Sequence, residues 1–251
     1  MATATRRVAA RPRDYVRVAG PDAADFLQRM VSNDIEHAPC RAMLLTPKAR
    51  LIATVLVVRR ADDDFLLLTE PGLGGAVSST LLRARFAAKV EIEPEQHTSV
   101  VALGEEGEIP NDELGEPGAE LIDSGLEPTL SADEVERLRI EAARPAWGKE
   151  LDDSILPAEA GLDDTHVSFT KGCYPGQEPI ARLRHRGKVN RSLRALEVAD
   201  AQPGEEIRYG EKVVGRVTSA VGDRALGYVR VEVPAGAEVS VGGKTARTLS
   251  A

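Results

Sequence analysis

The last quarter of the chain is a series of short β-type runs separated by glycines, and this pattern limits the fold more than any other feature. The runs are Ser192–Val198, Glu206–Tyr209, Lys212–Ala220, Ala225–Val233 and Glu238–Val241. Gly242 and Gly243 after the last run suit a tight hairpin turn. Strands this short, connected by turns, predict a small antiparallel barrel or sandwich over residues 191–251.

The preceding part of the chain, residues 1–190, mixes helical and strand patterns. The expected elements are a helix capped by Asp22, a hairpin from Leu51 to Thr69, a helix from Gly74 to Ala88, and strands at Lys89–Ile92 and Thr98–Leu103. The three aspartates at 62–64 fall at the hairpin turn, where aspartate is common, and do not indicate a metal site. The order of these elements indicates an α+β layer fold.

Two segments of the N-terminal part have a one-sided charge. Before Asp14 the chain has four arginines and no acid, and we interpret this stretch as a frayed N-terminus in preference to a transit peptide. Residues 104–127 are acidic and rich in glycine and proline, with no lysine or arginine, which is typical of a surface excursion between lobes. A capping box at Ser131–Glu134 then starts a new helix.

The stretch Lys171–Glu178 places a thiol, a base, two glycines and a carboxylate within eight positions. Pro175 and Gly176 suit a type II turn, and Pro179 suits the first turn of a following helix. Cys173 is therefore expected just before a helix N-terminus and near Lys171, and both features favour a thiolate. The alternative is an inert, half-buried cysteine. We take Cys173 and Lys171 as candidate catalytic residues.

The octapeptide Lys-Gly-Cys-Tyr-Pro-Gly-Gln-Glu resembles the signature of the YgfZ family, the folate-binding relatives of the glycine-cleavage T-protein that include mitochondrial iron-sulfur assembly factors. The resemblance continues at Arg139–Gly148, at Leu156–Leu162 and from Val18 to Asp34. It is weakest between residues 69 and 130. It implies three domains around a central folate channel, and hence an α+β class with a T-protein-like folate-binding body in residues 1–190 and a C-terminal antiparallel β-barrel in 191–251.

The resemblance also implies a binding set for tetrahydrofolate or a derivative. A carboxylate can accept two hydrogen bonds from the amide edge of a pterin, an aromatic ring can cover its face, and an arginine can pair with the glutamate tail. On the matching positions the set is Glu141, Glu159, Trp147, Tyr174, Gln177, Glu178 and Arg191. Each of four residues also has a purely structural alternative. Glu141 could be a strand-surface residue, Glu159 a helix cap or ion-pair partner, Trp147 a core residue and Arg191 a solvated residue.

One departure from the T-protein pattern bears on activity. T-proteins that transfer an aminomethyl group carry an acid at the end of an Asn-Ala-x-Asn-x-x-Lys-Asp type block. The comparable stretch here, Thr69–Ala76, has no aspartate at its end. Glu70 could substitute for that acid only if the alignment is shifted. General acid-base help is worth roughly 10²–10⁴-fold. We therefore expect an accessory protein that supports assembly or repair of iron-sulfur enzymes, and indirectly tRNA modification. The alternatives are an aminomethyltransferase and a non-catalytic folate sensor.

Composition limits the partners and the compartment. The net charge of -8 disfavours direct stable binding of nucleic acid, although the basic run at residues 182–194 is available for an anionic ligand. Cys40 and Cys173 are far apart with no CxxC pair, which is typical of a reducing cytoplasm and argues against a disulfide or a metal site. No apolar run reaches the roughly 20 residues of a membrane helix. The expected partners are a reduced folate and iron-sulfur enzymes or assembly factors.

Overall fold

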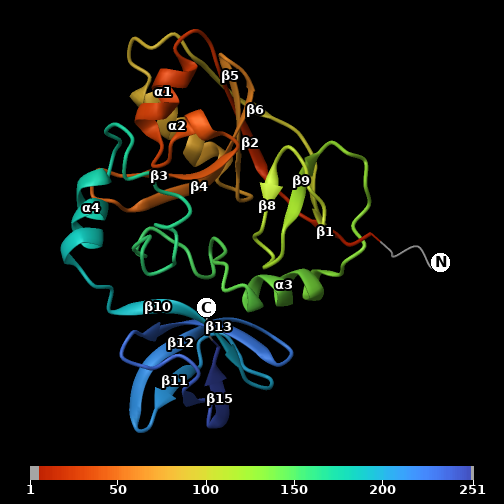
Figure 1. Cartoon of the computed structure of the whole chain (residues 1–251), viewed down its shortest axis with the longest axis vertical. Coiled ribbons are helices and arrows are strands. Elements are labelled where there is room, and N and C mark those ends of the chain that lie inside the picture. Colours follow the sequence, from red (N-terminus) through yellow and green to blue (C-terminus); the bar gives the residue numbers. More distant parts are fainter. Residues whose placement is uncertain (1–5, 250–251) are drawn as a thin grey trace.

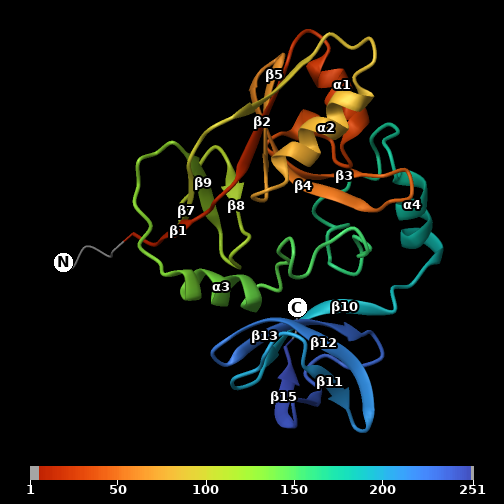
Figure 2. The same cartoon turned by 180° about the vertical axis from the view of Figure 1, so that it is seen from behind.

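The structure is a computed structural model that describes residues 6–249, arranged as three lobes around a central region (Figures 1 and 2). Residues 1–5 and 250–251, at the ends of the two predicted domains, lie outside the described residues, as does the side chain of Arg186 in the basic run. Between residues 6 and 249, none of the helices has the length and apolar composition needed to span a membrane.

The first lobe is a five-stranded antiparallel sheet in the order β3-β4-β5-β2-β6. Its elements are β2 (Asp14–Ala19), α1 (Ala23–Met30), the 3₁₀ turn η1 (Ile35–His37), β3 (Cys40–Leu45), β4 (Leu51–Ala61), β5 (Asp64–Thr69), α2 (Gly74–Ala84) and β6 (Glu91–Glu95). The apolar faces of α1 and α2 pack on the sheet through Phe26, Leu27 and Val77. The β4–β5 hairpin confirms the sequence prediction.

The prediction for Asp22 is wrong in its mechanism. Asp22 occupies the N-cap position of α1 but makes no capping hydrogen bond. Its Oδ2 accepts instead from the backbone N–H of Lys89, at 2.7 Å, because the chain before β6 returns past the start of α1. The carboxylate therefore ties two segments together, which local spacing does not reveal.

The second lobe is a four-stranded antiparallel sheet in the order β1-β7-β9-β8 with one helix. Its elements are β1 (Val8–Ala10), β7 (Ser99–Leu103), β8 (Pro110–Asn111), β9 (Gly118–Ile122) and α3 (Ala132–Glu141). The predicted capping box of α3 is present, since Ser131 and Glu134 each accept from the other's backbone N–H. Leu103 and Leu114 lie in the core of this lobe, and the partly buried Leu138 of α3 packs against them.

Both predictions for the one-sided charge segments are wrong. From residue 6 onward the N-terminal stretch is not frayed, because β1 pairs with β7. The acidic stretch is not merely a surface excursion, because it forms β8 and β9 and buries Glu120. The two segments are ordered because they neutralise each other: Arg11 and Arg13 of the N-terminal segment form ion pairs with Glu113 and Glu120 of the acidic segment. Each segment is read wrongly when its composition is taken alone.

The third lobe is a closed antiparallel barrel in the order β10-β13-β12-β11-β14-β15. Its strands are β10 (Arg191–Glu197), β11 (Glu206–Tyr209), β12 (Lys212–Val221), β13 (Arg224–Arg230), β14 (Glu238–Val241) and β15 (Lys244–Thr248). Leu196, Ile207 and Val229 fill its interior. Of the two predicted arrangements, barrel or sandwich, the barrel is the one formed.

A long connection with little regular structure, residues 142–176, passes between the lobes and leads to α4 (Gln177–Arg186). It supplies Leu151, Leu162 and Tyr174 to a core shared with Met43 of the first lobe and Tyr228 of the barrel. The Tyr228 hydroxyl donates to the carbonyl of Glu150 at 2.9 Å. This shared core fixes the three lobes against one another and so shapes the space between them.

Candidate functional site

A cavity of about 680 Å³ lies where the three lobes meet. Ligand sites for small molecules span roughly 300–1,000 Å³, so the cavity can hold one. Every lobe contributes to its wall, together with the connection after α3. The charged and polar lining residues are Arg11, Arg41, Thr54, Glu70, Glu113, Glu136, Arg139, Arg144, Glu159, Thr165, His166, Ser192 and Arg194.

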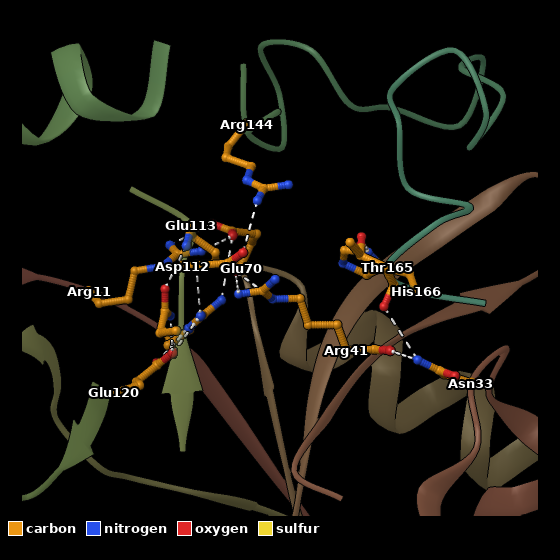
Figure 3. A network of polar contacts seen from close by, with 12 residues as sticks. Arg11, Asn33, Arg41, Glu70, Asp112, Glu113, Glu120, Arg144, Thr165 and His166 are labelled. Carbon is orange, nitrogen blue, oxygen red and sulfur yellow. Dashed lines mark hydrogen bonds and ion pairs between the residues drawn. The ribbon is translucent and has the colours of Figure 1, made fainter. Parts of the chain in front are cut away.

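The side of the cavity formed by the first two lobes carries a network of ion pairs (Figure 3). Arg11 donates to Glu70 at 2.6 Å and to Glu113 at 2.9 Å. Arg13 donates two hydrogen bonds to Glu120, at 2.9 and 2.8 Å. Burial alone would raise the pKa of the Glu113 carboxyl, but the neighbouring arginines outweigh it and hold that pKa well below its usual range. Glu113 is therefore ionised near neutral pH.

The network continues to the connection after α3 through Asp112. Arg41 of β3 contacts Asp112 at 2.5 Å, and Arg144 donates to the same carboxylate at 3.1 Å. Figure 3 shows Arg144 reaching from its loop toward Asp112 and Glu113. Asp112 thus links the sheet of the first lobe to the loop that carries Arg144 on the cavity wall.

His166 lies on the same wall and is a neutral group there. Its Nδ1 lies 2.8 Å from the hydroxyl of Thr165. Burial and the nearby cation of Arg41 lower the pKa of His166 to about 4. The imidazole is consequently uncharged at neutral pH, with one ring nitrogen as a hydrogen-bond donor and the other as an acceptor.

Of the predicted binding residues, Glu159 lines the cavity. Arg191 holds it by two hydrogen bonds, at 3.0 and 3.2 Å, and the N–H of Leu156 lies 3.4 Å from the same carboxylate. The structure therefore brings Glu159 and Arg191 together as a pair. Arg191 orients the carboxylate and does not itself line the cavity.

Glu141 and Trp147 do not line the cavity. Glu141 lies near the end of α3, a helix, and accepts from Arg224 of the barrel at 3.0 Å while also pairing with Arg137. The face of α3 that lines the cavity carries Val135, Glu136 and Arg139 instead. Trp147 packs half-buried between the core of the first lobe and the shared core. Its position matches the structural alternative for that residue.

The thiol motif has a different setting. Cys173 is exposed and does not line the cavity, while Tyr174 behind it is buried in the shared core. Gly176 has a positive φ of 84° at the N-cap of α4, and a Cβ there would lie 2.7 Å from the carbonyl oxygen of Thr46. Only glycine fits this approach. Gln177 begins α4 half-buried, and Glu178 is exposed and pairs with Arg182 at 2.6 Å.

The ammonium of Lys171 contacts residues that lie far from the thiol motif in the sequence. It donates to the carbonyls of Val31 and Asn33, at 2.7 and 2.8 Å, at the end of α1. Burial lowers the pKa of Lys171 to about 8, partly offset by Asp34 and Cys40. These contacts anchor the loop that carries Cys173 to the first lobe, which is a positioning role.

The sequence interpretation missed the buried network, including Arg11, Glu113 and His166. One signal was present. A segment with four arginines and no acid and a later segment with acids and no base are complementary, and complementary charge is a reason to pair two segments. The remaining network residues, such as Arg41 and Arg144, carry no comparable signal in the sequence.

Known proteins resemble this chain over most of its length. The family model for the CAF17 C-terminal beta-barrel domain matches residues 180–250. The tRNA-modifying protein YgfZ of Edwardsiella ictaluri is 27% identical over 71% of this chain and 66% of its own. The mitochondrial iron-sulfur cluster assembly factor IBA57 of Homo sapiens is 26% identical over 87% of this chain and 74% of its own. The predicted resemblance to the YgfZ family is confirmed.

The fold is shared with an aminomethyltransferase. The structure of the glycine cleavage system aminomethyltransferase T from Bartonella henselae superposes with a TM-score of 0.80, covering 98% of this chain and 85% of that one at 20% sequence identity. This likeness and the closed barrel confirm the predicted α+β class with a T-protein-like body and a C-terminal antiparallel barrel.

Proposed function

We propose that this protein is a folate-binding accessory protein of the YgfZ type, which supports assembly or repair of iron-sulfur enzymes and thereby indirectly tRNA modification. The observation that carries the proposal is the cavity of about 680 Å³ lined by all three lobes. Its fold is that of an aminomethyltransferase, and relatives along the chain are named for tRNA modification and iron-sulfur cluster assembly. The proposed partners are a reduced folate and iron-sulfur enzymes or assembly factors, in a reducing cytoplasm.

The cavity wall fits a reduced folate in size and chemistry. Leu114, Leu151 and Leu162 give it apolar surface to cover a ring. A carboxylate has about four lone-pair sites, so Glu159 can accept from the N–H edge of a pterin while Arg191 holds its other sites. When bound, the folate would supply a carrier for one-carbon units. The protein's own part is to bind the ring, orient it and shield it from water.

A second candidate is an aminomethyltransferase, favoured by the position of Glu70. This residue follows β5 directly and lines the cavity. However, Arg11 holds its carboxylate at 2.6 and 3.3 Å, and Arg13 lies 3.6 Å away. The carboxylate is therefore already engaged in ion pairs with two guanidinium groups and is not free to contact the reacting nitrogen of a folate. We expect no methylene transfer in a reconstituted glycine-cleavage assay, and turnover comparable to an authentic T-protein would make this second candidate the better one.

Cys173 separates the accessory function from a third candidate, a folate sensor. A protein that only binds folate has no need of a thiol, whereas one that acts on iron-sulfur partners can present an exposed cysteine to them. In a deletion strain, Cys173→Ser should abolish support of iron-sulfur enzyme activity while leaving folate affinity and melting temperature nearly unchanged. Cys40→Ser is the matched control and should restore activity.

Each outcome of that experiment has a separate meaning. Full complementation by Cys173→Ser at native expression would show that the thiol is not required and would favour the sensor. Loss of folding in Cys173→Ser would identify Cys173 as a core residue, which its exposed position argues against.

A further inference from the structure

Arg194 of β10 is the one arginine on the cavity wall that has no carboxylate partner among the described residues. The other four lining arginines, Arg11, Arg41, Arg139 and Arg144, each form an ion pair. All four glutamates of the wall are paired as well. The wall therefore carries one positive charge that residues 6–249 do not neutralise.

The guanidinium of Arg194 is held in place by two neutral acceptors. Its Nη1 donates to the carbonyl of Val233 at 2.5 Å, and its Nε donates to the hydroxyl of Ser192 at 3.3 Å. Ser192 and Ala235, which follows two residues after Val233, also line the cavity. The guanidinium thus lies at the cavity wall between them. A donor fixed in this way binds an acceptor with little loss of conformational entropy.

The two contacts leave donors of Arg194 free. A guanidinium has five N–H donors, so three remain, two of them on Nη2. Nη2 has no partner among the described residues, and it is not a buried atom, so an incoming group can reach it. A planar guanidinium matches a carboxylate by two parallel hydrogen bonds. The free donors and the uncompensated charge together indicate a carboxylate of the ligand as the acceptor.

Arg191, which the resemblance implies for the glutamate tail of a folate, has different partners. It donates twice to Glu159, at 3.0 and 3.2 Å, and its guanidinium lies 4.8 Å from the centroid of the Tyr228 ring. Arg194 lies three residues later on the same strand. Because successive side chains of a strand point to opposite faces, Arg194 and Arg191 face different sides of β10. A carboxylate on Arg194 is therefore kept apart from Glu159.

We propose that Arg194 binds the glutamate tail of the reduced folate and so places that tail against β10 of the barrel. The proposal rests on the proposed folate function. The tail carboxylates are the only charged groups of tetrahydrofolate near neutral pH, and they match the one cation of the wall that the described residues leave unpaired. Arg194 thereby selects folates with a charged tail over pterins without one.

The test is isothermal calorimetry on the purified protein with two ligands, tetrahydrofolate and its tail diamide, in which carboxamides replace both tail carboxylates. Wild type should bind tetrahydrofolate roughly tenfold or more tightly, as expected for hydrogen bonds between charged groups. Arg194→Met should bring the ratio of the two affinities close to unity by weakening the binding of tetrahydrofolate. Arg194→Gln, which is neutral but can still donate to Val233, should do the same. Arg216→Met, at an exposed barrel position, should leave the ratio unchanged.

The outcomes separate this inference from the proposed function. If wild type binds neither ligand, the folate function fails and the inference with it. If wild type binds both ligands equally well, the folate function stands and the inference alone is overturned. A preference that persists in Arg194→Met, with the melting temperature of wild type, also overturns it, since another cation would then bind the tail. Should Arg194→Met not fold, Arg194→Gln gives the same comparison.

Discussion

The buried network and the Cys173 loop differ in almost every physical respect. The network gathers residues from β-strands and loops of two lobes, and its charges are paired and largely removed from water. The loop is one contiguous stretch with an exposed thiol, anchored through Lys171. We infer a division of labour, in which the cavity holds a small molecule and the loop meets a partner protein.

The two regions also differ in what a mutation should do. The network is part of the folding energy, because a charge left unpaired inside the protein is costly. The loop contributes an exposed side chain whose loss should cost little stability. The predictions below probe this contrast, beginning with the largest expected effect.

Glu120→Gln should be strongly destabilising. The carboxylate of Glu120 has no exposed surface and accepts from Arg13, Ser99 and Asn111. Removing its charge breaks a fully buried ion pair and leaves Arg13 only the more distant carboxylates of Glu113 and Glu70, and breaking such a pair costs about 3–5 kcal/mol of unfolding free energy. Urea unfolding of the variant and of wild type measures this loss of unfolding free energy. Glu116→Gln, which loses a partly exposed pair with Arg7, should change stability little. A loss below about 1 kcal/mol for Glu120→Gln would show that the network is not structural.

His166→Asn should remove part of the acid sensitivity of folding. The folded-state pKa of His166, about 4, lies below the ordinary 6.5, so the unfolded chain binds more protons between these values. The stability that the neutral ring contributes is therefore complete above pH 6.5 and lost as the pH falls toward 4. We expect about 2 kcal/mol of that loss to disappear in the variant, allowing for partial exposure of the ring. Parallel curves of unfolding free energy against pH for both proteins would contradict this.

The sequence predicted the elements whose information is local. The β4–β5 hairpin, the α3 capping box and the turn at Gly176 each depend on a few adjacent residues. The arrangement of the whole chain, a T-protein-like body followed by a barrel, was predicted from the resemblance to the YgfZ family. What could not be predicted depends on long-range pairing: Glu141 faces Arg224 of the barrel, and Glu120 faces Arg13 across the second lobe. Lys171 was expected beside its neighbour Cys173, yet its ammonium contacts the end of α1, which only the folded chain brings near.

Cys173 should alkylate roughly tenfold or more faster than Cys40 near neutral pH. Cys40 is half-buried, and burial raises its pKa to about 11, while Cys173 is exposed near the end of the connection before α4. Mass spectrometry after timed iodoacetamide treatment gives both rates in one sample. Equal rates would mean that the two cysteines are equally shielded, and would remove the contrast between the loop and the interior.

Binding of a reduced folate to the purified protein tests the account most directly. Isothermal calorimetry with tetrahydrofolate should give a dissociation constant in the micromolar range, or roughly 8 kcal/mol. Glu159→Gln should weaken binding, because an amide has one acceptor oxygen where the carboxylate has two, and its NH₂ group donates. Glu141→Gln, outside the cavity, should bind as wild type does. No heat and no competition at millimolar tetrahydrofolate would contradict the assignment of the cavity.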